Sequence, residues 1–83
     1  MCTQLDFEQA IRDYSKLIFS ICHSMTRDYF VAEDLTQDTF VAAYQHLASF
    51  RGGSVKAWLT TIAANKCRDY LKSAARDIGI WAL

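Results

Sequence analysis

Apolar side chains recur at helical spacing along three stretches of the chain. In the first, from Phe7 to Met25, they fall three or four positions apart, and Gln9, Arg12, Asp13 and Lys16 fall off that line. Asp6 stands directly before this stretch, where its carboxylate can accept hydrogen bonds from the free N–H groups of a first helical turn. The pattern therefore predicts an amphipathic helix that begins after Asp6.

The second stretch, from Tyr29 to Ala48, concentrates its acidic residues near its start. Carboxylates are favourable there because the N-terminal end of a helix carries a partial positive charge, and Asp28 is the expected cap. Phe40 and Tyr44 lie four positions apart, so this aromatic pair either widens the inward face or lies beside it. The inward line that the spacing predicts consists of Val31, Leu35, Thr39, Ala42 or Ala43, and Leu47.

A break follows, because the paired glycines beside serines between Ser49 and Ser54 do not continue a helix at ordinary cost. Ser54 is the expected cap of a third helix, from Val55 to about Ala75. Most of the basic residues of this stretch lie off its apolar line. That line consists of Val55, Trp58, Leu59, Ile62, Ala63, Tyr70, Leu71 and Ala74.

These stretches predict an all-α fold, a compact bundle of three main helices. Eighty-three residues suffice for one small core, the hydrophobic share is 52%, and the absence of proline leaves few helix breakers. We expect residues 1–76 to form the domain. The tail, residues 77–83, is predicted either to pack back as a short extra helical element or to begin an interdomain linker.

The cysteines and the N-terminus indicate the compartment. Cys2, Cys22 and Cys67 form no paired spacing, which favours a reducing environment over a secreted, disulfide-bonded domain. The N-terminus lacks the apolar run of a signal peptide, and no stretch approaches the roughly 18 apolar residues of a membrane span. We therefore expect a cytoplasmic protein without a membrane span.

The formal net charge is zero, but the two halves of the chain differ. Residues 1–50 carry three basic against seven acidic side chains, whereas residues 51–83 carry six basic against two acidic ones. An acidic half followed by a basic half predicts two different partners, one of them polyanionic.

Metal binding and catalysis find little support in the residue pattern. Cys22, His23, His46 and Cys67 could be imagined as ligands, but they lack the close paired spacing of metal sites. Small buried hydrophobes are the commoner interpretation of such cysteines. Because the sequence also lacks a phosphate-binding glycine loop and a recognisable nucleophile–base arrangement, we predict no enzyme, no metal and no cofactor.

The order of the parts is more informative than any one motif. The sequence A-E-D-L-x-Q-D-x-F (Ala32 to Phe40), followed by W-L-x-x-I-A-x-N (Trp58 to Asn65), resembles the extracytoplasmic-function (ECF) sigma factors of bacterial RNA polymerase. The resemblance extends from Phe7 to Arg76 and is to the region 2 domain. It implies a domain that binds core polymerase and that recognises and melts the minus-ten promoter element.

The resemblance implies a polymerase contact on the second helix. In the family, this helix docks on the coiled coil of the polymerase beta-prime subunit, and carboxylates beside apolar anchors suit such a contact. The positions that match this surface are Asp34, Leu35, Gln37, Asp38, Phe40, Val41 and Tyr44.

The resemblance also implies promoter contacts on the loop and the third helix. The family's loop captures a base that flips out of the melting non-template strand, and Asn65 matches a polar residue that reads a neighbouring base. The matching loop positions are Phe50, Arg51, Gly52, Gly53, Ser54, Val55 and Lys56. The positions expected to hold phosphates are Lys66, Arg68, Lys72 and Arg76.

Two features depart from the family pattern. Thr60 and Thr61 stand where relatives often carry an aromatic residue and an arginine, so strand contacts there are expected to differ. The family's second, helix-turn-helix domain has no counterpart here, so we expect a truncated form or a fragment. An anti-sigma factor is an expected regulator, and the alternative function is a protein–protein module without DNA affinity, whose basic helix binds such an acidic partner.

Overall fold

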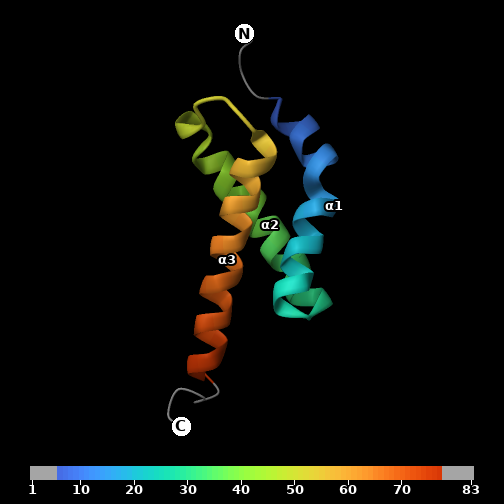
Figure 1. Ribbon diagram of the computed structural model, residues 1–83, viewed down its shortest axis with the longest axis vertical. Helices are drawn as coiled ribbons and strands as arrows, with labels where there is room; N and C mark the ends of the chain where they lie inside the picture. The colour runs from blue at the N-terminus through green and yellow to red at the C-terminus, as the bar shows by residue number, and fades with distance from the viewer. Residues whose placement is uncertain (1–5, 78–83) are drawn as a thin grey trace.

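The computed structural model of the chain describes residues 6–77, and every regular element within that range is a helix. Helix α2 runs antiparallel to α1, and α3 then returns alongside both (Figure 1). This arrangement confirms the predicted all-α bundle of three main helices. The rest of the predicted tail element, residues 78–83, lies outside the described residues. The elements are α1 (Phe7–Thr26), α2 (Tyr29–Gln45), the short 3-10 helix η1 (Leu47–Ser49) and α3 (Val55–Asp77).

Each long helix begins where the sequence predicts, because a side chain caps it. The carboxylate of Asp6 accepts a hydrogen bond from the backbone N–H three residues on at 3.2 Å, and Ser54 Oγ accepts the equivalent bond at 3.1 Å. Asp28 accepts two such bonds, at 3.0 and 3.1 Å. Caps of this kind contribute about 1 kcal/mol each to helix stability. Between α1 and α2, Arg27 adopts a left-handed conformation with a φ of 62°, which turns the chain within two residues.

Helix α2 ends earlier than predicted. Its last residue is Gln45 rather than Ala48. The short 3-10 helix η1 follows, and after it comes the loop that contains Gly52 and Gly53. The N–H of Phe50 donates to the carbonyl oxygen of Leu47 at 3.1 Å, which closes η1.

One core joins the three helices. Ile18 of α1, Thr39 of α2 and Leu59 of α3 are fully buried, and the Thr39 hydroxyl is satisfied because it donates to the Leu35 carbonyl oxygen at 2.7 Å. Several core members are small, so the helices can approach one another closely. The buried cluster consists of Ile18, Cys22, Ala32, Leu35, Phe40, Ala43, Leu59, Ala63 and Cys67.

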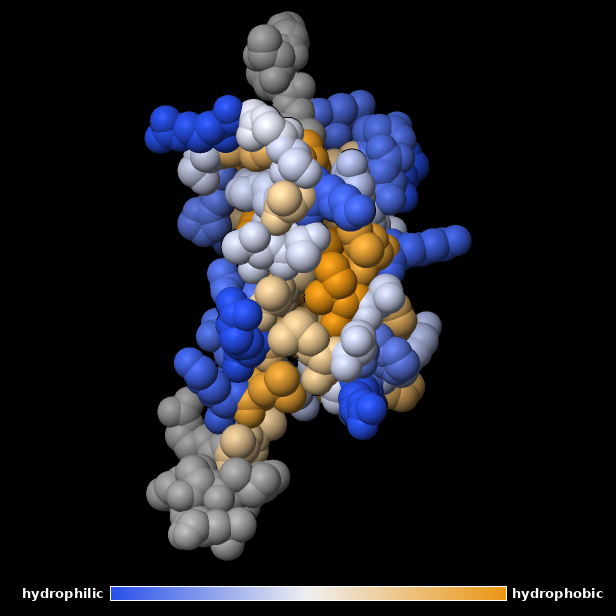
Figure 2. Space-filling model, viewed as in Figure 1, coloured by the Kyte–Doolittle hydropathy of each residue, from blue (hydrophilic) through white to orange (hydrophobic). Residues whose placement is uncertain are grey.

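The inward lines of α2 and α3 differ in part from the prediction. On α2, Ala32 is fully buried while its neighbour Val31 is only half-buried. On α3, Cys67 belongs to the core although the predicted line omitted it, and Leu71 remains 38% exposed. Helix α3 continues past the ends of the other two helices at its C-terminal end (Figure 1). On the face shown in Figure 2, hydrophobic residues gather along the centre and charged residues along the sides.

Within residues 6–77, no helix has both the length and the apolar character that a membrane crossing requires.

Candidate functional site

The exposed side of α2 is a continuous stripe that mixes acidic and apolar side chains. Its members lie three or four positions apart and turn away from the core positions of the same helix. Val41 is 54% exposed and Tyr44 is 66% exposed, so the stripe offers apolar area to a partner. We call this stripe the α2 face, and it consists of Asp34, Gln37, Asp38, Val41 and Tyr44.

Two other residues expected at the polymerase contact lie in the core. Leu35 is 7% exposed and Phe40 is 8% exposed. The ring of Phe7 packs edge-on against Phe40 at 6.4 Å between centroids and against Tyr44 at 5.6 Å. Helix α1 therefore covers Phe40, whereas Tyr44 is held at the rim. Leu35 and Phe40 support the α2 face from beneath rather than adding contact area.

The loop between η1 and α3 is fixed at both ends and open in the middle. At its start, Phe50 packs against Trp58, and at its end, Ser54 caps α3. Between them, Gly52 and Gly53 have φ values of +95° and +85°, which side chains with a Cβ rarely adopt. Among the described residues, nothing beyond the chain neighbours lies within 4 Å of the point where a Cβ would stand on either glycine. The backbone there is accessible to a ligand.

The other loop positions divide into exposed and structural ones. Arg51 and Lys56 are exposed, so their charges are available to phosphates. Val55 is half-buried and packs against the core cluster, which makes it a support of the loop.

A second exposed stripe runs along α3 from the loop. It begins one turn after Ser54, and Asn65 lies about 16 Å along the helix axis from that serine, given a rise of about 1.5 Å per residue. Arg68 donates a hydrogen bond to Asn65 Oδ1 across one turn. We call this stripe the α3 face, and it consists of Ala57, Thr61, Asn65, Arg68 and Lys72.

The remaining basic positions lie at the edges of the α3 face. Lys66 is half-buried beside it. Arg76 lies in the last turn of α3, and its side chain lies outside the described residues. Thr60 and Thr61 donate their hydroxyl hydrogens to backbone carbonyls one turn back, at 2.7 and 3.0 Å. These threonines therefore offer a strand only acceptor lone pairs, unlike the aromatic residue and arginine expected there in relatives.

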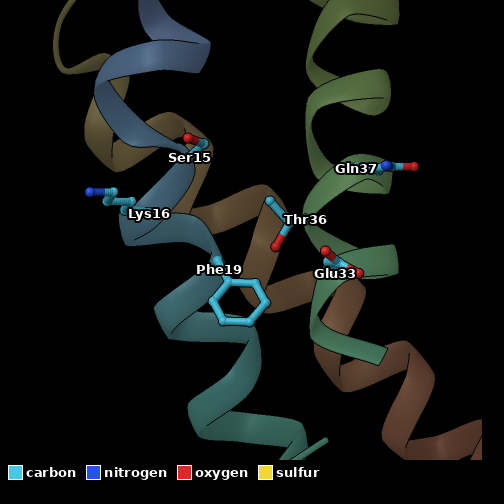
Figure 3. A pocket seen from close by; sticks show the side chains of 6 residues that line it. All are labelled: Ser15, Lys16, Phe19, Glu33, Thr36 and Gln37. Carbon is cyan, nitrogen blue, oxygen red and sulfur yellow. The ribbon is translucent and has the colours of Figure 1, made fainter. Parts of the chain in front are cut away.

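A shallow groove of about 360 Å³ between α1 and α2 was not predicted. Figure 3 shows the ring of Phe19 between the two helices, with Lys16 pointing outward from one rim and Gln37 from the other. The signal in the sequence was Phe19 itself, an aromatic residue off the apolar line of the first helix. The lining residues are Ser15, Lys16, Phe19, Glu33, Thr36 and Gln37.

Two thiols meet inside the bundle, Cys22 from α1 and Cys67 from α3. Both are free and fully buried. Burial raises the pKa of the Cys67 thiol to about 12, and its hydrogen bond with Cys22 adds to the shift. A thiol held neutral in this way is a packing group rather than a nucleophile. Among residues 6–77, no cluster of three histidine, cysteine or acidic side chains could hold a metal ion.

The chain is similar to known proteins over most of its length. Residues 10–77 match the family described as Sigma-70 region 2. The chain is 33% identical over 76 residues to the ECF RNA polymerase sigma factor SigM of Bacillus subtilis, an alignment that covers 92% of this chain and 47% of SigM. It is 46% identical over 57 residues to the RNA polymerase sigma factor YlaC of the same organism, covering 68% of this chain and 33% of YlaC.

A mycobacterial sigma factor is similar to the chain as well. The chain is 33% identical over 72 residues to the ECF RNA polymerase sigma factor SigG of Mycobacterium tuberculosis, covering 86% of this chain and 20% of SigG. The chain thus spans about half or less of the length of these curated relatives. No solved structure gives a significant match.

Proposed function

The chain belongs to the sigma-70 region 2 family, and from that membership we propose that it binds core RNA polymerase and recognises and melts a minus-ten promoter element at the start of transcription. Proteins of this kind bring promoter recognition to an enzyme, so we propose no active site for the chain itself. We propose that the chain acts in the cytoplasm, where bacterial RNA polymerase and promoter DNA lie.

The observation that carries the proposal is the pairing of two exposed stripes on different helices. The α2 face is acidic with apolar anchors, and the α3 face is basic and continuous with an open glycine loop. One surface suits a basic protein partner and the other a nucleic acid strand, so one small domain can hold both at once.

On the α2 face, the proposed partner is the coiled coil of the beta-prime subunit. Asp34 and Asp38 are one turn apart and exposed, so they can steer toward arginines of the partner and pair with them. Val41 and Tyr44 follow on the same side and supply the apolar area that a desolvated contact needs.

On the α3 face, the proposed partner is the non-template strand. Unpairing and unstacking one base costs a few kcal/mol, and melting proceeds when capture of that base offsets the cost. The open backbone at Gly52 and Gly53 is the proposed capture point. Arg51, Lys56 and Lys72 are exposed around the loop and along α3, where they can hold phosphates without reading sequence.

A second candidate function, binding of a regulator such as an anti-sigma factor, is favoured by the groove of Figure 3. Beyond the groove, the Phe19 ring stacks on His23 at 5.7 Å and packs edge-on against Tyr29 at 5.2 Å. Phe30 follows and is 77% exposed. This aromatic edge suits a protein partner. It is compatible with the first function, since regulators of this kind act on sigma factors.

A pair of binding measurements on the intact chain tests the proposal. Fluorescence anisotropy compares single strands that carry candidate minus-ten elements with scrambled strands, and a pull-down measures binding to a beta-prime coiled-coil fragment. We expect binding to both, with affinity for DNA that falls as salt rises. Binding to the coiled coil without any preference among DNA strands would leave only the protein–protein function.

A further inference from the structure

Among the described residues of the α3 face, the one hydrogen bond between two side chains joins Arg68 to Asn65. The guanidinium of Arg68 donates to Asn65 Oδ1, across one helical turn, and both side chains are exposed. Residues three apart on a helix face each other, so the bond needs no unusual geometry.

This bond decides which groups the pair offers to a base. A free asparagine amide presents an acceptor and a donor, and with both it can pair with the N6 and N7 edge of adenine. Here Asn65 Oδ1 is turned toward Arg68. One lone pair of that oxygen is thereby engaged, whereas the two N–H donors of the Asn65 amide make no protein hydrogen bond among the described residues and remain free for a base.

We infer that Arg68 is a positioning residue that engages the acceptor of Asn65 and leaves its amide N–H groups to read a base, so that Asn65 selects guanine over adenine at one position of the single strand. Guanine presents two adjacent acceptors, N7 and O6, whereas adenine presents N7 beside the N6 amino donor. The amide N–H donors of Asn65 can therefore bond to both acceptors of guanine. On adenine, one of these donors would face the N6 amino group, which is also a donor. The inference rests on the proposed function, since it assumes that the α3 face reads a strand.

Thr61 and Lys72 flank the Asn65–Arg68 pair on the α3 face. Thr61 lies one turn before Asn65 on the same face, and its hydroxyl hydrogen is already donated to the Ala57 carbonyl oxygen. Lys72 lies one turn after Arg68, exposed and four residues on, where it can hold a phosphate. Lys72 therefore supplies a matched control, a charge on the same face that is seven positions from Asn65.

The test compares Arg68→Met with Lys72→Met in the full chain, against single strands that differ only by guanine or adenine at each position in turn. Each variant loses one charge, so both should bind all strands more weakly to a similar degree. Only Arg68→Met should also lose or reverse the guanine preference, by about tenfold, the scale of one good base contact. Replacing guanine by 7-deazaguanine, which lacks the N7 acceptor, should weaken wild type and spare Arg68→Met.

Two further variants separate positioning from charge. Arg68→Gln keeps an N–H donor without the charge, so it should restore the guanine preference at reduced affinity. In an Asn65→Ala background, Arg68→Met and Lys72→Met should become equivalent, because no amide remains to be positioned. If wild type prefers its promoter strand but Arg68→Met behaves like Lys72→Met, the inference is wrong while the proposed function stands. If wild type shows no strand preference at all, the proposed function itself fails.

Discussion

Phe50 packs its ring against the indole of Trp58, with the centroids 4.8 Å apart and the ring planes at 39°. Trp58 in turn packs against the core cluster, so this contact ties the start of the glycine loop to the bundle. The Ser54 cap ties the other end. A loop fixed at both ends loses less conformational entropy when it captures a ligand, which favours binding.

Removing the aromatic contact is expected to loosen the loop. Phe50→Ala should lower the free energy of unfolding by about 1–2 kcal/mol, from the lost aromatic pair and its apolar burial. It should also shift the fluorescence of Trp58 to longer wavelength, because the indole gains contact with water. Urea unfolding and emission spectra measure both effects. A Trp81→Phe background leaves Trp58 as the single reporter, since the chain has two tryptophans.

Phe50→Leu is the matched control for this change. Leucine keeps an apolar contact with the indole, so the emission shift should be much smaller. Identical spectra for wild type and Phe50→Ala would mean that the two rings do not touch in solution.

The α2 face predicts a charge-dependent contact with polymerase. Asp38→Arg should weaken binding to a beta-prime coiled-coil fragment at least tenfold, because it replaces an attraction by a repulsion at an exposed position. Helicity measured by circular dichroism should remain near that of wild type. Glu8→Arg is the control, since Glu8 is an exposed acid on α1 with the same change of charge. Equal losses in the two variants would point to net charge rather than to a specific contact.

Leu35 and Val41 are expected to separate stability from binding on the same helix. Leu35 is 7% exposed, so Leu35→Ala should cost about 2–5 kcal/mol of stability, as buried leucines do. Val41 is 54% exposed, so Val41→Ala should change the unfolding midpoint little and still weaken the coiled-coil contact. Thermal unfolding and the pull-down give the two quantities. A stable Leu35→Ala variant that no longer binds would restore Leu35 to the interface.

Most of the fold could be predicted from the sequence, because local chemistry sets the helix boundaries. Asp6, Asp28 and Ser54 cap the helices where the pattern places them, and the paired glycines lie in the loop between η1 and α3. What could not be predicted is how far the helices overlap. Leu71 lies on the predicted apolar line and is nevertheless 38% exposed, because the burial of a position depends on how the helices pack.

The candidate site was only partly visible in the sequence for a similar reason. Family resemblance gives the positions but not their burial, so Phe40 was expected at the polymerase contact although Phe7 covers it. The bond between Arg68 and Asn65 depends on side-chain conformations that spacing alone permits but does not require. The groove at Phe19 exists only once α1 and α2 are packed.

The buried thiol pair predicts how stability changes in alkali. Burial and the contact with Cys22 raise the pKa of Cys67 from 9.0 to about 12, so the folded protein holds this proton more tightly than the unfolded chain does. The resulting stabilisation is complete below the pKa of Cys67 in the unfolded chain and is lost as the pH rises toward its pKa in the folded protein.

Urea midpoints measured from neutral pH to about pH 11 should therefore fall more steeply for wild type than for Cys67→Ala. The other ionisable groups are common to both proteins, so the difference between the two curves reports on Cys67. The alanine variant should be less stable at neutral pH, because it leaves a small cavity beside Cys22, and the two curves should converge in alkali. Parallel curves would mean that the Cys67 thiol titrates near its ordinary value and that the two thiols are not buried together.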